Sequence, residues 1–268
     1  MMTMTPKLRF QRFEFKYVLD PDQFKAIRKY LRQYLEPDDF VRKSKQEFYE
    51  VVSLYYDSPR FFYFWEKIDG RRKRKKIRLR TYKNDGKWAP ISFFEIKRKV
   101  DMVIFKDRFV LSPEDLSCFE KEGALFNINN IDKHKKDIVD EFHFERGIHS
   151  LSPKLLVVYN REPYLGKYNT NVRVTFDYSI RARESAYLGY DDDHFNDVSG
   201  DRVIMELKFR GSLPFYIERV IKEHNLGRVP YSKYCEGLEA SYSLPMITML
   251  CNKSQSDTLT LNSSNLLG

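Results

Sequence analysis

The sequence predicts an α+β fold in which mostly antiparallel strands close into a barrel and the helices pack outside it. Three observations predict this fold. Many segments alternate polar and apolar residues, which is typical of strands with two different faces. Helix signals fall between those segments. Lys and Arg predominate on the polar side of the strands, which predicts a barrel with a polar, cationic lumen.

The strands are recognised by alternation with a period of two, or by a β-rich composition between turn signals. Turn signals stand at Asp57-Ser58-Pro59, Asp69-Gly70 and Asn84-Asp85-Gly86. The expected strands cover residues 9–19, 48–56, 74–82, 91–99, 103–111, 154–163, 172–176, 179–184 and 202–209.

The helices are indicated by helical periodicity and by capping residues. Asp20 can cap a helix over residues 21–35, and Ser112 followed by Pro113 is a second start signal. The other expected helical segments cover residues 60–67, 132–147, 213–224 and 232–242.

Composition limits the class of protein. The chain has 268 residues, of which 42% are hydrophobic, and a formal net charge of +9. This favours one large domain over residues 1–245, followed by a polar, flexible tail over 246–268. The basic surplus indicates a polyanionic partner: nucleic acid, an anionic membrane or a phosphorylated molecule.

The three cysteines are far apart in the sequence and lack the spacing of metal ligands; they are Cys118, Cys235 and Cys251. We therefore expect a reduced, cytoplasmic chain. No stretch of the sequence reaches the roughly 20 apolar residues that a membrane-spanning helix needs. A membrane protein could still be a partner. We expect a monomer.

The most informative pattern is the face on which charges lie. In the strand expected over residues 74–82, Arg74, Lys76, Arg78 and Arg80 share one side, opposite Ile77 and its neighbours. Other strands separate polar from apolar residues in the same way, with these sets on one side: Arg12, Glu14 and Lys16; Glu95, Lys97 and Lys99; Lys106 and Arg108; Tyr159 and Arg161; Arg173, Thr175 and Asp177; Glu206 and Lys208. A single strand of this kind is usually a solvated surface. Repetition over seven strands instead indicates an inward-facing site for an anion, because like charges opposite each other destabilise a sheet.

Glutamates lie among these cations. Glu14, Glu95 and Glu206 each stand two residues from a Lys on the same expected face. They either neutralise that Lys or hold a divalent metal, Mg²⁺ or Mn²⁺, that bridges phosphate oxygens. The sequence has no glycine-rich Walker loop, so side chains would have to bind the phosphates.

An ordered set of motifs resembles the VTC polyphosphate polymerase domain, which belongs to the triphosphate tunnel metalloenzyme (CYTH-like) superfamily. The resemblance runs from about Arg9 to Tyr242. It rests on RFEFKY at 12–17, SLYYD at 53–57, KIRLRTY at 76–82, FEIKRK at 94–99, YNR at 159–161, RVTFD at 173–177, ELKF at 206–209 and SKY at 232–234. The superfamily often opens with Glu-x-Glu-x-Lys, but this chain has Arg12 in the first position, which puts a second metal site in doubt.

The resemblance implies a tunnel of eight antiparallel strands that transfers the γ-phosphate of ATP to inorganic polyphosphate with Mn²⁺ or Mg²⁺. The implied catalytic residues are Arg78, Arg80, Lys97, Arg161, Arg173 and Lys233. The implied substrate-binding residues are Lys16, Lys76, Lys99, Lys106, Tyr159, Lys208 and Ser232. Glu206 is the principal implied metal ligand, with Glu14 and Glu95 as further candidates.

Other functions are compatible with the same tunnel. A hydrolase would cleave triphosphate with water that Glu14 or Glu95 activates, and a non-catalytic subunit would only bind polyphosphate. Nucleic acid is a less suitable partner, because the cations alternate along strands instead of clustering on an exposed helix. The histidines are scattered, so no His-based catalytic group is expected.

Overall fold

The structure is a computed structural model that describes residues 12–42, 44–101, 103–122, 132–191 and 194–242. The chain forms two compact units. The first contains the described residues up to Tyr49, together with Tyr159–Ser179 and Ser199–Tyr231. The second contains Glu50–Val158, Ile180–Val198 and the described residues from Ser232 onward. The tail expected over residues 246–268 lies outside the described residues.

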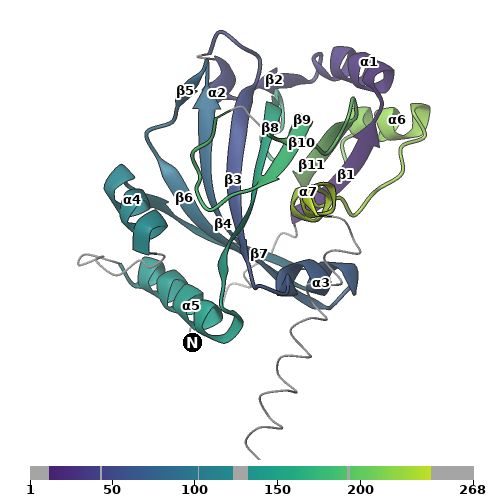
Figure 1. Cartoon of the computed structure of the whole chain (residues 1–268). Helices are drawn as coiled ribbons and strands as arrows, with labels where there is room; N and C mark the ends of the chain where they lie inside the picture. The colour runs from purple at the N-terminus through teal and green to yellow at the C-terminus, as the bar shows by residue number, and fades with distance from the viewer. Residues whose placement is uncertain (1–11, 43, 102, 123–131, 192–193, 243–268) are drawn as a thin grey trace, which may run out of the picture. The chain divides into compact units, whose positions relative to one another are not determined.

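Eight strands follow one another as hydrogen-bonded neighbours in the order β1-β11-β9-β8-β3-β4-β6-β7 (Figure 1). They are β1 Arg12–Leu19, β3 Tyr49–Asp57, β4 Lys73–Asn84, β6 Ser92–Val100, β7 Val103–Leu111, β8 Ser152–Gly166, β9 Arg173–Glu184 and β11 Val203–Arg210. Short strands β2 (Leu35–Pro37), β5 (Lys87–Trp88) and β10 (Asn196–Asp197) pair with β8, β4 and β9. Every pair with a defined register is antiparallel. The α+β class is therefore confirmed. The closed barrel is not, because no pairing joins β1 to β7 within the residues that the structure describes.

The first unit has its core on the apolar side of β1, β11 and β9. Period-two alternation places Tyr17, Leu207 and Phe176 on that side, where they are buried. Two helices supply the other half of the core: α1 (Pro21–Leu31) through Ile27, and α6 (Phe215–Glu223) through Ile217. These two helices lie side by side (Figure 1). The charged residues of the same strands therefore occupy the opposite face.

Helix α1 begins as predicted and ends earlier. Asp20 accepts a hydrogen bond from the Gln23 backbone, and the Gln23 side chain returns one, which forms a capping box. The predicted helix over 21–35 is too long, because α1 ends at Leu31. Residues 32–34 form a turn, in which the Lys167 ammonium group donates to the carbonyls of Arg32 and Gln33 at 2.9 and 3.1 Å. From Leu35 the chain pairs with β8 as β2.

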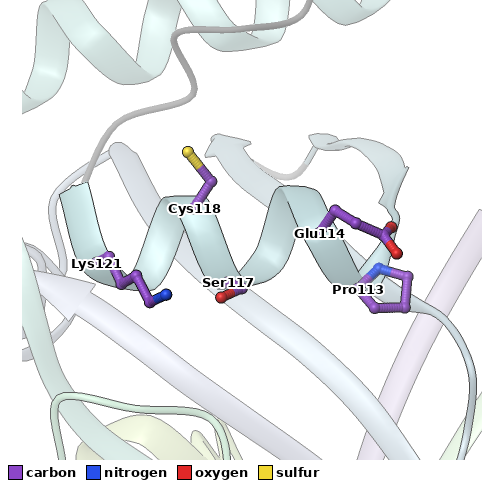
Figure 2. Close-up of a pocket in the computed structure, with 5 residues that line it drawn as sticks. All are labelled: Pro113, Glu114, Ser117, Cys118 and Lys121. Carbon is purple, nitrogen blue, oxygen red and sulfur yellow. The ribbon is translucent and has the colours of Figure 1, made fainter.

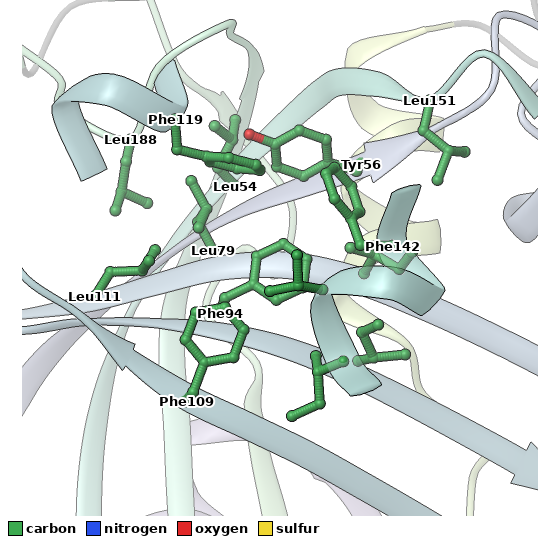
Figure 3. Packing of buried hydrophobic residues seen from close by; sticks show 14 of the residues in the cluster. Leu54, Tyr56, Leu79, Phe94, Phe109, Leu111, Phe119, Phe142, Leu151 and Leu188 are labelled. Carbon is green, nitrogen blue, oxygen red and sulfur yellow. The ribbon is translucent and has the colours of Figure 1, made fainter. Parts of the chain in front are cut away.

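The second unit has its core between the sheet and two helices. Leu54, Leu79 and Phe94 point from β3, β4 and β6 to the same side and meet Phe119 and Phe142 (Figure 3). Phe119 belongs to α4 (Pro113–Glu122), and Phe142 belongs to α5 (Lys133–His149). The Phe142 ring contacts those of Phe94 and Phe119 at centroid distances of 5.0 and 5.5 Å. The helices therefore cover the apolar face of this sheet.

The remaining elements are short. Helices α2 (Asp39–Arg42), α3 (Phe62–Ile68) and α7 (Lys233–Ser241) complete the described set.

Two separate strands were predicted over 172–176 and 179–184, but β9 is continuous. Ser179 has a φ of 49° within it, so the prediction mistook a local distortion for a strand end.

Candidate functional site

The polar face of the second unit carries a row of facing cations. Lys97 in β6 lies opposite Lys76 in β4 on one side and opposite Lys106 in β7 on the other. Arg74 similarly lies opposite Lys99. Residues directly opposite each other in an antiparallel pair point to the same face, so these like charges are close neighbours.

One carboxylate stands on this face among the charged residues of β4, β6 and β7. The cations number eight, and the full set is Arg74, Lys76, Arg78, Arg80, Lys97, Lys99, Lys106 and Arg108, with Glu95 as the carboxylate. Such an excess of positive charge repels itself in a folded sheet. We refer to this set as the cationic face.

The opposite face of the same strands provides an internal comparison. There Lys75 and Arg98 also face each other, but carboxylates neutralise them. Lys75 Nζ lies 2.7 Å from Glu141 and 2.5 Å from Glu145 of α5. Arg98 Nε donates to Glu141 at 2.8 Å, and Arg98 also pairs with Asp107. The helix side therefore balances its charge with the carboxylates of α5 and Asp107, whereas Glu95 is the one carboxylate among the charged residues that β4, β6 and β7 place on the cationic face.

Glu95 is the counter-ion of the cationic face. It is 1% exposed, and its Oε2 accepts a hydrogen bond from Arg78 Nε at 2.6 Å and forms an ion pair with Arg78 Nη2, also at 2.6 Å. Its Oε1 lies 2.5 Å from Lys106 Nζ. Burial alone would raise the pKa of Glu95, but Arg78, Arg80 and Lys106 hold it well below its usual range. Glu95 is therefore ionised, and both of its oxygens are engaged by cations.

The same surroundings act on Lys106. Burial and the neighbouring Arg78 lower the pKa of Lys106 to about 8, although Glu95 opposes the shift. The side chain is still 37% exposed, so an anion from solvent can reach its ammonium group.

Helix α7 also contributes to the cationic face. Ser232 caps its N-terminus by accepting from the Cys235 backbone, and Lys76 Nζ donates to the same Ser232 hydroxyl. Lys233 follows as the first helical residue and is buried. A Cβ atom at Gly237 would come within 2.9 Å of Ala182, so glycine allows the helix to approach the sheet. Lys76, Ser232 and Lys233 are thus brought to one place, next to the positive end of a helix dipole.

The polar face of the first unit is different, because its charges are nearly balanced. Arg161 forms two hydrogen bonds with Asp177, at 2.6 and 2.7 Å, and lies 3.8 Å from Glu206. Lys208 pairs with Glu206, and Lys16 lies 3.7 Å from Glu14. Two further predicted residues belong to this unit: Arg173 Nη2 lies 3.2 Å from Asp38, and the Tyr159 ring lies 5.3 Å below the Arg161 guanidinium.

A buried hydroxyl beside Glu206 has no hydrogen-bond partner within the described part of the chain. Thr175 is 2% exposed and lies directly opposite Glu206 in the β9–β11 pair, so both side chains share one face. Carboxylate and hydroxyl oxygens are hard ligands that suit Mg²⁺ or Mn²⁺. Mg²⁺ is commonly bound through one or two carboxylates together with substrate phosphates. Glu206 and Thr175 therefore fit such a metal, with Lys208 and Arg161 as the cations beside that carboxylate.

No complete metal site is built from side chains alone. Among the residues that the structure describes, no group of three or more His, Cys, Asp or Glu side chains is placed to hold a metal ion. A metal bound here would depend on oxygens from a phosphate ligand or from water.

The predicted residues thus divide between the units. Lys76, Arg78, Arg80, Glu95, Lys97, Lys99, Lys106, Ser232 and Lys233 lie in the second, and Glu14, Lys16, Tyr159, Arg161, Arg173, Glu206 and Lys208 lie in the first. Sequence reasoning missed Tyr55 as a polar partner of Arg78. The available signal was its position next to Leu54 on β3, since adjacent strand residues point to opposite faces. Tyr55 accepts a hydrogen bond from Arg78 Nη1 at 3.0 Å.

The helix side of the second unit offers a different kind of surface. A shallow hollow on α4 is lined by Pro113, Glu114, Ser117, Cys118 and Lys121 (Figure 2). Its charges are one carboxylate and one ammonium, so it lacks the cation excess of the sheet.

No helix in the described part of the chain is long and apolar enough to cross a membrane.

Comparison with known proteins agrees with the motif order. The VTC domain matches residues 11–242, a range that includes every residue that the structure describes. The chain belongs to the VTC domain family. No curated protein matches this VTC domain in sequence.

Solved structures similar to this VTC domain include a proposed adenylate cyclase of Bacillus halodurans, which is 13% identical, with a TM-score of 0.47; the match covers 82% of this chain and 92% of that one. The PH1819 protein of Pyrococcus horikoshii OT3 is 14% identical, with a TM-score of 0.43, and the match covers 85% and 98%. The RNA triphosphatase Pct1 of S. pombe, solved with the Spt5 CTD, is 12% identical, with a TM-score of 0.24 and coverage of 92% and 75%.

Proposed function

We propose that this VTC domain is a polyphosphate polymerase, which transfers the γ-phosphate of ATP to a growing inorganic polyphosphate chain and releases ADP. Membership of the family supports a function connected with polyphosphate. The observation that carries the proposal is the cationic face, where Lys76, Lys97 and Lys106 stand opposite one another across three strands. A bound chain of phosphates would remove their mutual repulsion.

The proposed roles follow from the charges. Phosphoryl transfer depends on positioning and on neutralising negative charge. Arg78 and Arg80 would bind the triphosphate and stabilise charge on the leaving β-phosphate. Lys76, Lys97, Lys99 and Lys106 would hold the phosphates, and Ser232 with Lys233 would add contacts at the α7 N-terminus.

The acceptor explains why no protein base is required. A terminal phosphate is already anionic at neutral pH, whereas water would need to lose a proton. Glu95 is a poor base for that purpose, because the cations around it keep its pKa low. This supports phosphate over water as the acceptor where Glu95 is concerned, and therefore a polymerase. The other candidate base of a hydrolase, Glu14, lies 3.7 Å from Lys16.

The metal belongs to the same proposal. Glu206 with Thr175 would hold Mn²⁺ or Mg²⁺, with Glu14 as a further ligand, and the bound metal would neutralise phosphate charge. Lys16, Tyr159, Arg161, Arg173 and Lys208 would contact the phosphates bound to it. We further propose that the strands close into a tunnel with a cationic lumen and that the domain covers residues 1–245. We also propose that the protein is a cytoplasmic monomer with a membrane-protein partner.

One assay tests the reaction. The protein is incubated with ATP and Mn²⁺, polyphosphate is resolved by chain length on a gel, and ADP is measured in parallel. Long phosphate chains formed in step with ADP support the polymerase. Orthophosphate without chains would identify a hydrolase, and polyphosphate binding without ADP release would identify a binding subunit. A reaction with EDTA serves as the control for the metal.

A further inference from the structure

The hydroxyl of Tyr55 has a place on the cationic face. Tyr55 in β3 lies directly opposite Arg78 in β4, so both side chains point to the same side. Its oxygen accepts from Arg78 Nη1 at 3.0 Å. The Tyr55 proton must then point elsewhere, and no residue in the described part of the chain accepts it. The hydroxyl thus retains a hydrogen-bond donor next to an arginine proposed to bind phosphate.

The Tyr55 ring is held by contacts that do not involve its hydroxyl. It packs against the ring of Tyr234 in α7, with centroids 5.0 Å apart. Tyr234 is fixed in turn, because its hydroxyl donates to Asp57 at 2.6 Å. Asp57 is fully buried and also accepts from the backbone of Tyr63 and Phe64 at the start of α3. Packing therefore aims the Tyr55 hydroxyl without help from the hydroxyl itself.

The charges around Tyr55 make its hydroxyl a strong donor. It is 5% exposed, and burial alone would raise its pKa. Arg78, Arg80 and Lys76 of β4 nevertheless lower the pKa of Tyr55 to about 8. From the other elements, Glu95 of β6 lies beyond Arg78, and the neutral phenol of Tyr234 in α7 packs against the ring. The net field is positive, which favours an anionic acceptor for the proton.

We infer that Tyr55 is a phosphate-contacting residue, whose hydroxyl donates a hydrogen bond to an oxygen of the phosphate group that Arg78 binds. This inference rests on the proposed function, because it requires phosphate on the cationic face. The residue would then act in substrate recognition through a neutral donor placed among cations.

The first test measures binding of tripolyphosphate by calorimetry at pH 7, with the whole chain. Tyr55→Phe removes the hydroxyl and keeps the ring. We expect it to weaken binding about tenfold to a hundredfold, as for a hydrogen bond to a charged group. Tyr56→Phe is the matched control, because Tyr56 is equally buried on the same strand but faces the helices. It should bind as the wild type does.

A second variant separates direct contact from an effect on Arg78. If Tyr55 only oriented Arg78, adding Tyr55→Phe to Arg78→Ala would cause no further loss of affinity. Direct contact predicts a further loss of at least severalfold. Ultraviolet absorption gives an independent measure: tripolyphosphate should suppress the tyrosinate signal that distinguishes the wild type from Tyr55→Phe at pH 8.5.

The outcomes distinguish this inference from the proposed function. Equal affinities of the wild type, Tyr55→Phe and Tyr56→Phe would overturn the role of Tyr55 and leave the proposed function standing. So would a double variant no weaker than Arg78→Ala, or a tyrosinate signal that tripolyphosphate leaves unchanged. A wild type that does not bind tripolyphosphate would overturn both.

Discussion

Arg78 and Glu95 face each other across the β4–β6 pair, and two nitrogens of the guanidinium lie 2.6 Å from one carboxylate oxygen. This pair fixes the guanidinium in the middle of the cationic face. Its remaining nitrogen, Nη1, reaches Tyr55. Glu95 thus positions Arg78. Its role as a metal ligand stays a prediction from the sequence.

Glu95→Gln tests this assignment. Removing one member of a buried ion pair should lower the free energy of unfolding by about 3 kcal/mol at neutral pH, measured in urea. The Glu95 pKa is depressed in the fold, so this contribution is present above about pH 4.3, the usual value for Glu, and is lost as the pH falls towards the folded-state pKa. The Mn²⁺ concentration for half-maximal turnover should not change. A large rise in that concentration would show that Glu95 is a metal ligand after all.

Neutralising facing lysines should have opposite effects on the two faces of the sheet. Lys97→Gln relieves repulsion from Lys76 and Lys106, so it should raise the free energy of unfolding by up to about 1 kcal/mol at low salt. Lys75→Gln instead leaves Glu141 and Glu145 without their shared cation, and should lower it by about 1 kcal/mol. Lys97→Gln should also weaken tripolyphosphate binding, and Lys75→Gln should not. The same sign of stability change for both variants would argue against the charge imbalance.

Affinity for polyphosphate should depend on pH near 8. The pKa of Lys106 is lowered to about 8, so the side chain is charged below that pH and neutral above it. Tyr55 becomes negative over the same range. Both changes oppose an anionic ligand, so affinity should fall as the pH rises from 7 to 9.

Lys106→Arg is the control for this dependence, because an arginine stays charged throughout that range. It should retain only the part of the decline that Tyr55 causes, and adding Tyr55→Phe should flatten the profile. An unchanged profile in that double variant would assign the titration to other groups.

Thr175→Val tests the site beside Glu206. The substitution keeps the shape and removes a hydroxyl that has no partner in the described structure, so stability should stay the same or rise slightly. Binding of Mn²⁺ in the presence of tripolyphosphate, followed by electron paramagnetic resonance, should weaken severalfold. Glu206→Gln should weaken it more. Unaltered Mn²⁺ binding in both variants would move the metal site elsewhere.

The sequence predicted the strands well because each has two chemically distinct faces. Val103–Leu111 was predicted with its observed limits, and Asp20 and Asp132 cap the expected helices. Local periodicity could not show that the helix expected over residues 21–35 would end before Leu35, since the hydrogen bonds that hold Leu35 in β2 come from β8, far along the chain.

The sequence predicted which residues belong to the candidate site better than it predicted which of them lie opposite or contact one another. Alternation placed Arg78 and Arg80 on one face, but it could not give the register that sets Lys97 between two lysines. Alternation also predicted the same excess of cations on the polar faces of both units. In the first unit, however, Arg161 is paired with Asp177. Uncharged partners such as Tyr55 and Thr175 carry no signal in a charge pattern, because their roles depend on what lies opposite.

We propose above all that the cationic face acts on phosphate in the chemical step, with Arg78 at its centre. The most direct test of this role measures kcat of Arg78→Ala as ADP release at saturating ATP and Mn²⁺. Lys75→Gln, on the opposite face of the sheet, is the control. An arginine that neutralises transition-state charge can contribute about 10³–10⁵ in rate, so we predict a fall of at least about a thousandfold for Arg78→Ala and little change for Lys75→Gln. A kcat for Arg78→Ala equal to that of the wild type would contradict the claim.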